Sequence, residues 1–345
     1  MRLSRRVTVI VKVTNACDMQ CKYCFIEPSV FHKTMSDETA LRVVHAFLDS
    51  PWFESVNFAW HGGEPLLKSP EFFRRIFDEQ RACSGPVAYT NSTQTNATHL
   101  DERMLELLLA NDVSIGLSLD GTQGQTAASR IGRRTRALTV RQSTPGARAA
   151  DAHATTVDAA RRLQKRGRRA AAIVTVNRNN VDHPEEVYRE FRDRHIDMQV
   201  NPLTRAGLAD TSLGADLGVG AEEYGVFLVR LFDAWFDDPD RPIHIEPFGQ
   251  HVGRILGEEV QHSCFYTLSC HHFFLGISPD GDLFPCGMFQ GEPSFRYGNI
   301  HKLNPCRWPR RRSSARSRSA SDGRCRPVRG APSSTSATAA ACSTP

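Results

Sequence analysis

Three cysteines near the start of the chain have the spacing of a metal site. Cys17, Cys21 and Cys24 follow the pattern C-x3-C-x2-C, directly after the apolar run Val7–Val13. Three thiolates in one short loop can bind three irons of a four-iron, four-sulfur cluster, which leaves the fourth iron without a protein ligand. An open coordination position is where a metal does chemistry, as catalytic zinc sites show.

Two other interpretations of this loop are open from its spacing alone. The cysteines could bind zinc together with a distant fourth ligand. They could also be unrelated buried thiols, because free cysteine is often buried. Other motifs in the chain are needed to distinguish these possibilities.

The composition indicates a globular chain with reduced thiols. The 345 residues are 40% hydrophobic and 23% charged, which suits one large α/β domain and a smaller extension. No apolar run approaches a membrane span, and the N-terminus leads into a strand and not a signal peptide. We therefore expect a cytoplasmic protein. Its ten cysteines are clustered in a long chain, which favours metal ligands over disulfides.

The net charge of +5 does not indicate a nucleic-acid partner, because the positive charge is concentrated at the end of the chain. Residues 306–345 contain nine Arg and one Asp, a net charge of +8, so the remaining chain carries −3. We therefore expect no nucleic-acid-binding face on the folded part. The Arg-, Ser- and Ala-rich composition of residues 306–345 cannot bury a core. We interpret it as a disordered tail, from an out-of-frame reading of a GC-rich gene in preference to a nucleic-acid-binding arm.

Strand-like runs alternate with helical patterns through the first two thirds of the chain. We expect strands at Val7–Val13, Ser55–Trp60, from Val87 onward, Val113–Leu119, Ala170–Val176 and Ile196–Leu203. We expect helices after a Ser36 cap and at Pro70–Ala82, Leu100–Ala110, Val157–Lys165 and Pro184–Arg194. This alternation predicts an α/β fold, a partial (βα)6 TIM-like barrel with parallel strands. Ligands then bind at the carboxyl ends of the strands.

Polar motifs fall at those strand ends. His61-Gly62-Gly63-Glu64-Pro65 follows the second strand, Gln94 and Asn96 end the third, and Ser118 ends the fourth. Glycines there would let the backbone approach a ligand closely. Residues 121–153 hold six Arg and no apolar period, so we expect an irregular insert, either loop or disorder.

A second group of cysteines lies beyond residue 260. Cys264 and Cys270 precede a turn at Pro279-Asp280-Gly281 between two strand-like runs. Such a β-hairpin would bring Cys286 back towards Cys270. Three thiols gathered at the base of a hairpin again indicate a metal site.

Taken together, the cysteine loop with Tyr23 and the Gly-Gly-Glu-Pro motif resemble those of radical S-adenosylmethionine (SAM) enzymes. The resemblance implies a barrel of the radical SAM type, with a [4Fe-4S] cluster on Cys17, Cys21 and Cys24 and SAM chelating the open iron. It implies SAM contacts from Tyr23, Gly62, Gly63, Glu64, Pro65, Gln94, Asn96, Ser118, Arg130 and Leu203. Cys83 we interpret as a bystander at a helix end.

The second cysteine group resembles the auxiliary-cluster extension called SPASM or twitch, which implies an auxiliary [4Fe-4S] cluster on Cys264, Cys270 and Cys286. The family's later dense cysteine run is missing, so we expect an incomplete extension in which His271 or His272 could substitute as a ligand. The implied domains are a core barrel at residues 1–210, the extension at 221–305 and the tail at 306–345.

The resemblance implies reductive cleavage of SAM to a 5′-deoxyadenosyl radical that takes hydrogen from a peptide or protein. A reduced flavodoxin- or ferredoxin-type protein would donate the electron, and we expect no membrane partner. Sulfatase maturases carry Asp directly after the cysteine equivalent to Cys286, where this chain has Gly287. We therefore favour peptide cross-linking or another maturation of ribosomally made peptides over formylglycine formation. A non-catalytic iron–sulfur or zinc-binding remnant is the alternative from another class.

Overall fold

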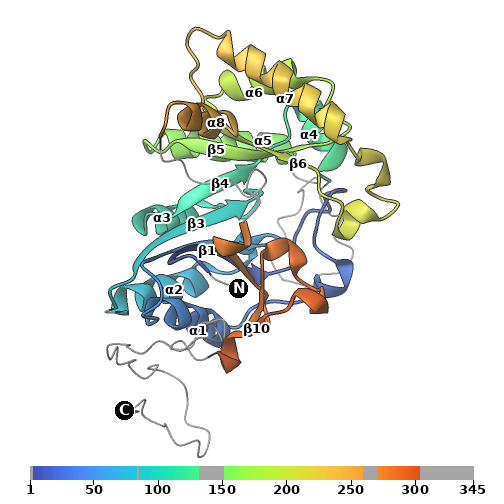
Figure 1. Ribbon diagram of the computed structural model, residues 1–345. Coiled ribbons are helices and arrows are strands. Elements are labelled where there is room, and N and C mark those ends of the chain that lie inside the picture. The colour runs from blue at the N-terminus through green and yellow to red at the C-terminus, as the bar shows by residue number, and fades with distance from the viewer. Residues whose placement is uncertain (1–2, 84, 132–150, 259–269, 304–345) are drawn as a thin grey trace, which may run out of the picture.

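One twisted sheet of ten strands organises the chain, in the order β10-β9-β8-β1-β2-β3-β4-β5-β6-β7 (Figure 1). The computed structural model describes residues 3–83, 85–131, 151–258 and 270–303, so Cys264 and the tail at 306–345 lie outside the described residues. The strands are β1 (Arg6–Thr14), β2 (Ser55–Gly62), β3 (Ala88–Thr95), β4 (Ser114–Ser118), β5 (Ala170–Val176), β6 (Ile196–Pro202), β7 (Ile245–Glu246), β8 (Phe274–Ile277), β9 (Asp282–Phe284) and β10 (Gly298–Asn299).

Strands β1 to β6 pair in parallel and in chain order, which confirms the predicted partial barrel. The helices are α1 (Asp37–Leu48), α2 (Pro70–Ala82), α3 (Glu102–Ala110), α4 (Gln123–Ser129), α5 (Ala152–Gln164), α6 (Pro184–Arg192), α7 (Ala221–Phe236) and α8 (Phe248–Ile255). The predicted bounds of β5 and α2 are confirmed, and the other predicted elements are present with shifted ends. Among the described residues β1 does not pair with β6, so the barrel stays open.

The outer face of the barrel strands carries the main apolar core. Alternate side chains of β1 are buried on this face: Val7, Val9, Val11 and Val13. Helix α1 covers them, and the ring of its Phe47 lies 6.1 Å from that of Phe58 on β2. Because side chains alternate along a strand, Ile10 and Lys12 of β1 point into the barrel, where both line its cavity.

The predicted irregular insert is partly wrong. Helix α4 lies inside it, and α5 begins at Ala152, before the predicted start. Thr122 and Gln125 form a reciprocal capping box at the start of α4, which is a helix signal that the composition hides. The buried residues of α4 are the polar Gln125, Thr126 and Ser129, so no apolar period marks it. Residues 132–150 lie outside the described part of the chain.

The predicted β-hairpin is present and extends the barrel sheet. Strands β8 and β9 pair in antiparallel fashion, and β8 pairs in parallel with β1 from Thr8–Phe274 to Val11–Ile277. The hairpin thereby covers backbone groups that an edge strand would leave unpaired. Barrel and hairpin share one sheet, and the predicted domain division between them stays a prediction.

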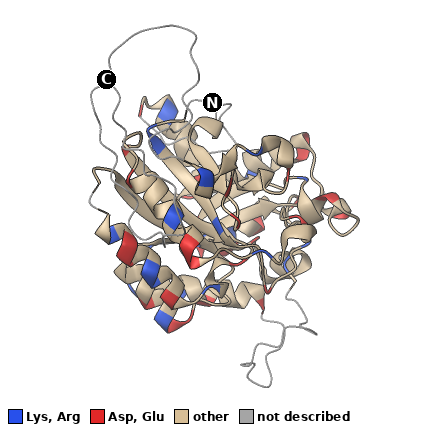
Figure 2. Cartoon of the chain, turned by 90° about the horizontal axis from the view of Figure 1, so that it is seen from below, with Lys and Arg blue, Asp and Glu red and all other residues tan. Residues whose placement is uncertain are grey.

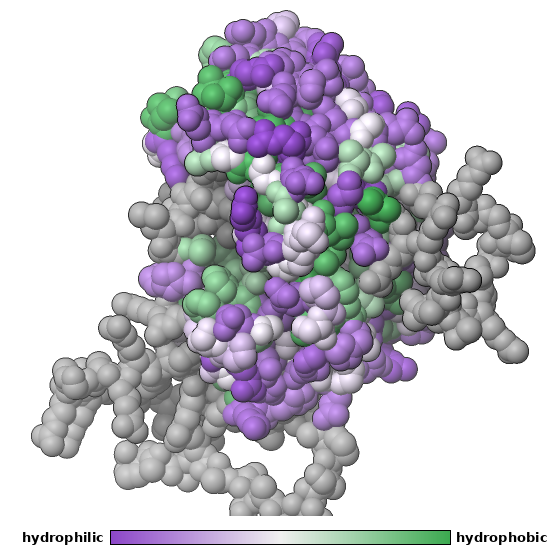
Figure 3. Space-filling model, turned by 90° about the vertical axis from the view of Figure 1, so that its right-hand side faces the viewer, coloured by the Kyte–Doolittle hydropathy of each residue, from purple (hydrophilic) through white to green (hydrophobic). Residues whose placement is uncertain are grey.

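Charges of both signs are interspersed over the described elements (Figure 2). Seen from the side that Figure 3 shows, apolar and weakly polar residues gather in the middle of the face, with strongly hydrophilic regions above and below. Within the described ranges, no helix has the length and hydropathy needed to cross a membrane.

The hairpin predicts the effect of adding one methyl group. A Cβ at Gly276 would lie 2.5 Å from the backbone carbonyl group of Cys286, so we expect Gly276→Ala to lower the free energy of unfolding by about 1–3 kcal/mol. Urea denaturation measures this change.

Gly225 provides the matched control, because it lies inside α7 with open space around its Cα. We expect Gly225→Ala to stabilise the protein by about 0.5–1 kcal/mol. Equal effects of the two substitutions would contradict the close packing of the hairpin.

Candidate active site

The three-cysteine loop follows β1 and faces a cavity of about 330 Å³ at the carboxyl ends of the strands. Cys17, Cys21 and Cys24 all line this cavity, as predicted from the strand order. Distant segments hold the loop in place: Lys22 N–H donates to the carbonyl of Ser129 at 2.9 Å, and Leu208 N–H donates to that of Cys24 at 2.8 Å. Helix α4 and the segment after β6 therefore fix the loop from two sides.

Burial makes the loop thiols less acidic in the absence of a metal. Burial raises the pKa of Cys21 to about 11 and also raises that of Cys17. A metal that binds them as thiolates must displace these protons.

The Gly-Gly-Glu turn packs directly against the cysteine loop. Gly63 N–H donates to the carbonyl of Thr14 at 2.8 Å, and Glu64 N–H donates to that of Ala16 at 2.9 Å. A Cβ at Gly62 would lie 1.9 Å from the Thr14 oxygen, and one at Gly63 would lie 2.3 Å from the Ala16 oxygen. The glycines therefore permit a close approach to the loop backbone, where we expected an approach to the ligand.

The Glu64 side chain is fully buried behind the cavity wall. Its Oε1 accepts from Leu66 N at 3.0 Å and from Thr95 Oγ1 at 2.7 Å, and its Oε2 accepts from Asn96 N at 2.8 Å. Burial raises its pKa to about 7 against these hydrogen bonds. Neither Glu64 nor Pro65 lines the cavity. These contacts favour a role in positioning Asn96 over the predicted direct contact with SAM.

A hydrogen-bonded chain crosses the cavity wall from the loop to α4. Tyr23 Oη donates to Asp120 Oδ2 at 2.5 Å and accepts from Arg130 Nη1 at 2.6 Å. Burial raises the pKa of Asp120 and that of Tyr23. Tyr23 and Arg130 line the cavity, while Asp120, absent from the predicted site, holds both from behind.

Two buried polar atoms beside the loop have no partner among the described residues: Asn15 Oδ1 and Arg130 Nε. Both residues line the cavity. One atom is an acceptor and the other a donor, so together they suit a ligand with an ammonium and a carboxylate group. The residues present therefore fit SAM, whose methionine part carries both groups.

The predicted polar residues of β3 and β4 also line the cavity. Gln94 Nε2 donates to Ser118 Oγ at 3.0 Å, and Asn96 Nδ2 donates to Asp18 Oδ1 at 3.0 Å. Burial alone would raise the pKa of Asp18, but hydrogen bonds, His99 foremost, lower it to about 2. Leu203 does not line the cavity, although its neighbours Pro202 and Thr204 do.

The hairpin brings its cysteine into the same cavity. Cys286 and Gly287 line it, whereas Cys270 does not. Burial raises the pKa of the Cys286 thiol. Because Cys264 lies outside the described residues, the ligand set of an auxiliary cluster stays a prediction.

Two further cavity residues were given no role from the sequence, although His61 begins the motif after the second strand. Lys12 and His61 line the cavity from β1 and β2. Burial, with Lys12 as a second cause, lowers the pKa of His61 to about 4. A charged residue in the otherwise apolar run Val7–Val13 was the available signal for Lys12.

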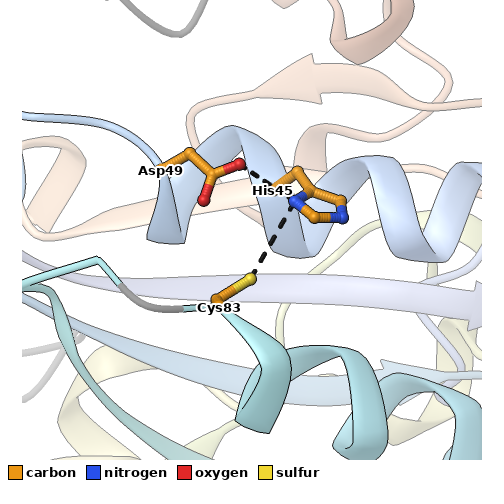
Figure 4. A group of neighbouring side chains, drawn as sticks. All are labelled: His45, Asp49 and Cys83. Carbon is orange, nitrogen blue, oxygen red and sulfur yellow. Dashed lines mark hydrogen bonds and ion pairs between the residues drawn. The ribbon is translucent and has the colours of Figure 1, made fainter. Parts of the chain in front are cut away.

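Cys83 lies away from the cavity, at the end of α2, with His45 and Asp49 of the α1 end (Figure 4). His45 Nδ1 lies 2.9 Å from Asp49 Oδ2 and 3.9 Å from Cys83 Sγ, and its Nε2 lies 2.8 Å from Glu79 Oε1. Both ring nitrogens are thus engaged by carboxylates. This cluster joins α1 to α2, in keeping with the interpretation of Cys83 as a bystander.

Comparison with known proteins adds sequence relatives. Residues 11–191 match the family model described as the radical SAM superfamily. A serine-type anaerobic sulfatase-maturating enzyme of Bacteroides thetaiotaomicron is 27% identical over 85% of this chain and 72% of its own length. A cysteine-type anaerobic sulfatase-maturating enzyme of Clostridium perfringens is 25% identical over 86% of this chain and 77% of its own length.

Solved structures share the fold. That of native anSMEcpe with bound AdoMet and Kp18Cys peptide matches with a TM-score of 0.72 at 24% identity, over 86% of this chain and 78% of that chain. That of Streptococcus suis SuiB bound to precursor peptide SuiA matches with a TM-score of 0.58 at 14% identity, over 86% and 63%.

The Glu64 contacts predict a loss of stability in Glu64→Gln. An amide has one acceptor oxygen and would point an N–H at one of three donors, so we expect unfolding at pH 8 to cost about 2 kcal/mol less than in the wild type. Urea denaturation measures this difference. Glu106→Gln on the exposed face of α3 is the control and should change little.

The raised pKa of Glu64 predicts a pH dependence. The unfolded chain loses this proton near 4.5 and the native state near 7. The protonated Glu64 side chain therefore makes its full contribution to the free energy of unfolding below pH 4.5. This contribution is lost as the pH rises towards 7. We expect the stability difference between wild type and Glu64→Gln to shrink over this range, and a constant difference would contradict the assignment.

Proposed function

Because the chain belongs to the radical SAM superfamily, we propose that it modifies a peptide or protein by hydrogen abstraction, as a peptide cross-linking or other maturation enzyme. A [4Fe-4S] cluster on Cys17, Cys21 and Cys24, together with SAM, supplies one-electron reduction and radical chemistry when bound. The observation that carries the proposal is that these three cysteines line one cavity together with Asn15 and Arg130, each of which has a buried polar atom without a partner among the described residues.

The cavity residues would bind and orient SAM. Asn15 Oδ1 can accept from its ammonium group, and Arg130 Nε can donate to its carboxylate, while Tyr23 and Asp120 hold the guanidinium in place. Gln94, Asn96 and Ser118 offer further polar contacts. Apolar residues fill other parts of the wall and keep water from the reacting atoms: Ile10, Met19, Phe25, Ile26, Phe31, Ile173, Leu208 and Met288. Exclusion of water protects reactive intermediates from side reactions.

A peptide substrate is supported by the relatives and by the surface beside the cavity. The relatives from Bacteroides thetaiotaomicron and Clostridium perfringens are sulfatase-maturating enzymes, and anSMEcpe and SuiB have been solved with bound peptides. Exposed aromatic side chains follow cavity residue Met288: the rings of Phe289 and Phe295 lie 4.5 Å apart, with Tyr297 nearby in sequence. Such aromatic groups are typical of interaction surfaces.

Cross-linking or a related maturation is favoured over formylglycine formation by the lack of a carboxylate base. Residue 287 is a glycine, and among the described residues no Asp or Glu lines the cavity. Sulfatase maturation is the second candidate, because these two relatives carry that activity in their names. Mass spectrometry after hydrazide treatment distinguishes the two products: a cross-link and the oxidation of serine to an aldehyde both remove two hydrogens, but only the aldehyde then gains the mass of the hydrazide adduct.

The remaining assignments belong to the same proposal. Residues 1–210 form the catalytic core, and residues 221–305 form an auxiliary-cluster extension whose ligands include Cys270 and Cys286. A reduced flavodoxin- or ferredoxin-type protein supplies the electron. The protein works in the cytoplasm.

Cys21→Ala tests the enzyme proposal. The wild type, reconstituted with iron and sulfide and reduced by dithionite with SAM, should form 5′-deoxyadenosine, and the variant should form none. The variant should also hold about four fewer irons per chain. Chromatography and iron analysis measure both.

Cys83→Ala is the matched control, because Cys83 lies outside the cavity; it should keep the iron and the product. No product from wild type with an intact cluster would remove the enzyme proposal. Zinc without acid-labile sulfide would support the non-catalytic remnant.

A further inference from the structure

Lys12 is a buried cation in the cavity wall. It lies on β1, with only 2% of its surface exposed, and lines the cavity beside Ile10. Its Nζ lies 4.7 Å above the ring of Phe25, on the cysteine loop. A buried ammonium is costly unless an anion or several acceptors compensate it.

No carboxylate of the described chain compensates this charge. The described ion pairs do not include Lys12, and no Asp or Glu lines the cavity. The other cation of the wall, Arg130, has Tyr23 and Asp120 as partners. Burial lowers the pKa of Lys12 to about 8, partly offset by the nearby thiols Cys24 and Cys286.

Gly287 lies beside Lys12 in the cavity wall. It follows Cys286 on the hairpin, and a Cβ built there would lie 3.1 Å from Ile10 Cγ2 and 3.3 Å from Lys12 Cε. A larger side chain at residue 287 would therefore cover the lysine stem. With glycine at this position, Lys12 stays part of the wall that a group from outside the chain can reach.

We propose that the cavity wall at Lys12 and Gly287 forms a subsite for a carboxylate of the substrate. The subsite rests on the proposed function and narrows its substrate class to peptides with an Asp or Glu side chain, or a C-terminal carboxylate, beside the residue that reacts. The ammonium donates to that carboxylate, which is a charge-assisted hydrogen bond in a place with little water. Arg130 Nε stays available for the carboxylate of SAM.

His61 and the cavity thiols are the other titratable groups that face Lys12. The pKa of His61 is lowered to about 4, so this side chain is neutral near pH 7 and does not compete as a cation. Ligated Cys24 and Cys286 would bring negative charge close to Lys12. A role for Lys12 in balancing that charge is the rival explanation that the experiment must separate.

Peptide binding to the reconstituted protein with SAM tests the subsite. The probes are capped, fluorescently labelled heptapeptides of glycine and serine with one central aspartate or one central asparagine. We expect wild type to bind the aspartate peptide about tenfold more tightly, because a hydrogen bond to a charged group is stronger than one to a neutral amide. Lys12→Met should remove the preference, and Lys12→Arg should keep part of it. Fluorescence anisotropy measures the dissociation constants.

A third probe separates the two sources of carboxylate. A neutral peptide with a free C-terminus is compared with its amide, and a preference for the free acid assigns the subsite to a chain end. A preference only for central aspartate assigns it to an acidic side chain. Either preference supports the subsite if Lys12→Met removes it.

Lys33→Met is the matched control, since Lys33 pairs with Asp280 at 2.5 Å on the protein surface; it should leave the preference unchanged.

Equal binding of all probes by wild type overturns the proposal and needs no variant. So does a preference that survives Lys12→Met in a protein with full iron content. The charge-balancing role is supported by two results together: wild type shows no carboxylate preference, and Lys12→Met shifts the cluster potential in electron paramagnetic resonance titrations. Binding is measured apart from SAM cleavage, so failure of the 5′-deoxyadenosine assay and failure of the subsite remain distinguishable.

Discussion

Two backbone hydrogen bonds join the ends of β1 and β2, and the site depends on them. Thr14 and Ala16 of the cysteine loop accept from Gly63 and Glu64. This contact leaves no room for a Cβ at Gly62 or Gly63. The loop that presents three thiols is thus held against a neighbouring strand end, and parallel pairing of β1 with β2 fixes the relative height of the two.

Buried carboxylates extend this control to the rest of the cavity wall. Glu64 binds backbone and side-chain donors from β3, and Asp120 binds Tyr23 of the loop. Burial makes each carboxylate costly to ionise, and satisfied hydrogen bonds offset part of that cost. The residues that face the ligand therefore rest on a second layer of polar contacts, which specifies one arrangement of the wall.

The hairpin gives the cavity its remaining side. Because β8 pairs with β1, the turn after β9 places Cys286 and Gly287 beside Lys12. Residues from the two ends of the described chain thereby share one cavity. Because the sheet is extended at its β1 edge, the cysteine loop and the hairpin line the same cavity, and the buried Lys12 lies between them.

The sequence by itself determined the barrel and the cysteine loop, because both depend on local pattern. Strand and helix periods, the Ser36 cap and the Pro279–Gly281 turn are short-range signals, and the structure has each. Helix α4 was missed because its buried residues are polar, so hydrophobic periodicity could not mark it. Only the tertiary structure decided that Glu64 and Leu203 do not line the cavity. It also decided that His61 and Lys12 line the cavity and that Asp120 supports its wall through Tyr23. Those assignments depend on which side chains meet across strands far apart in sequence, and on how deeply each charge is buried, which no local pattern records.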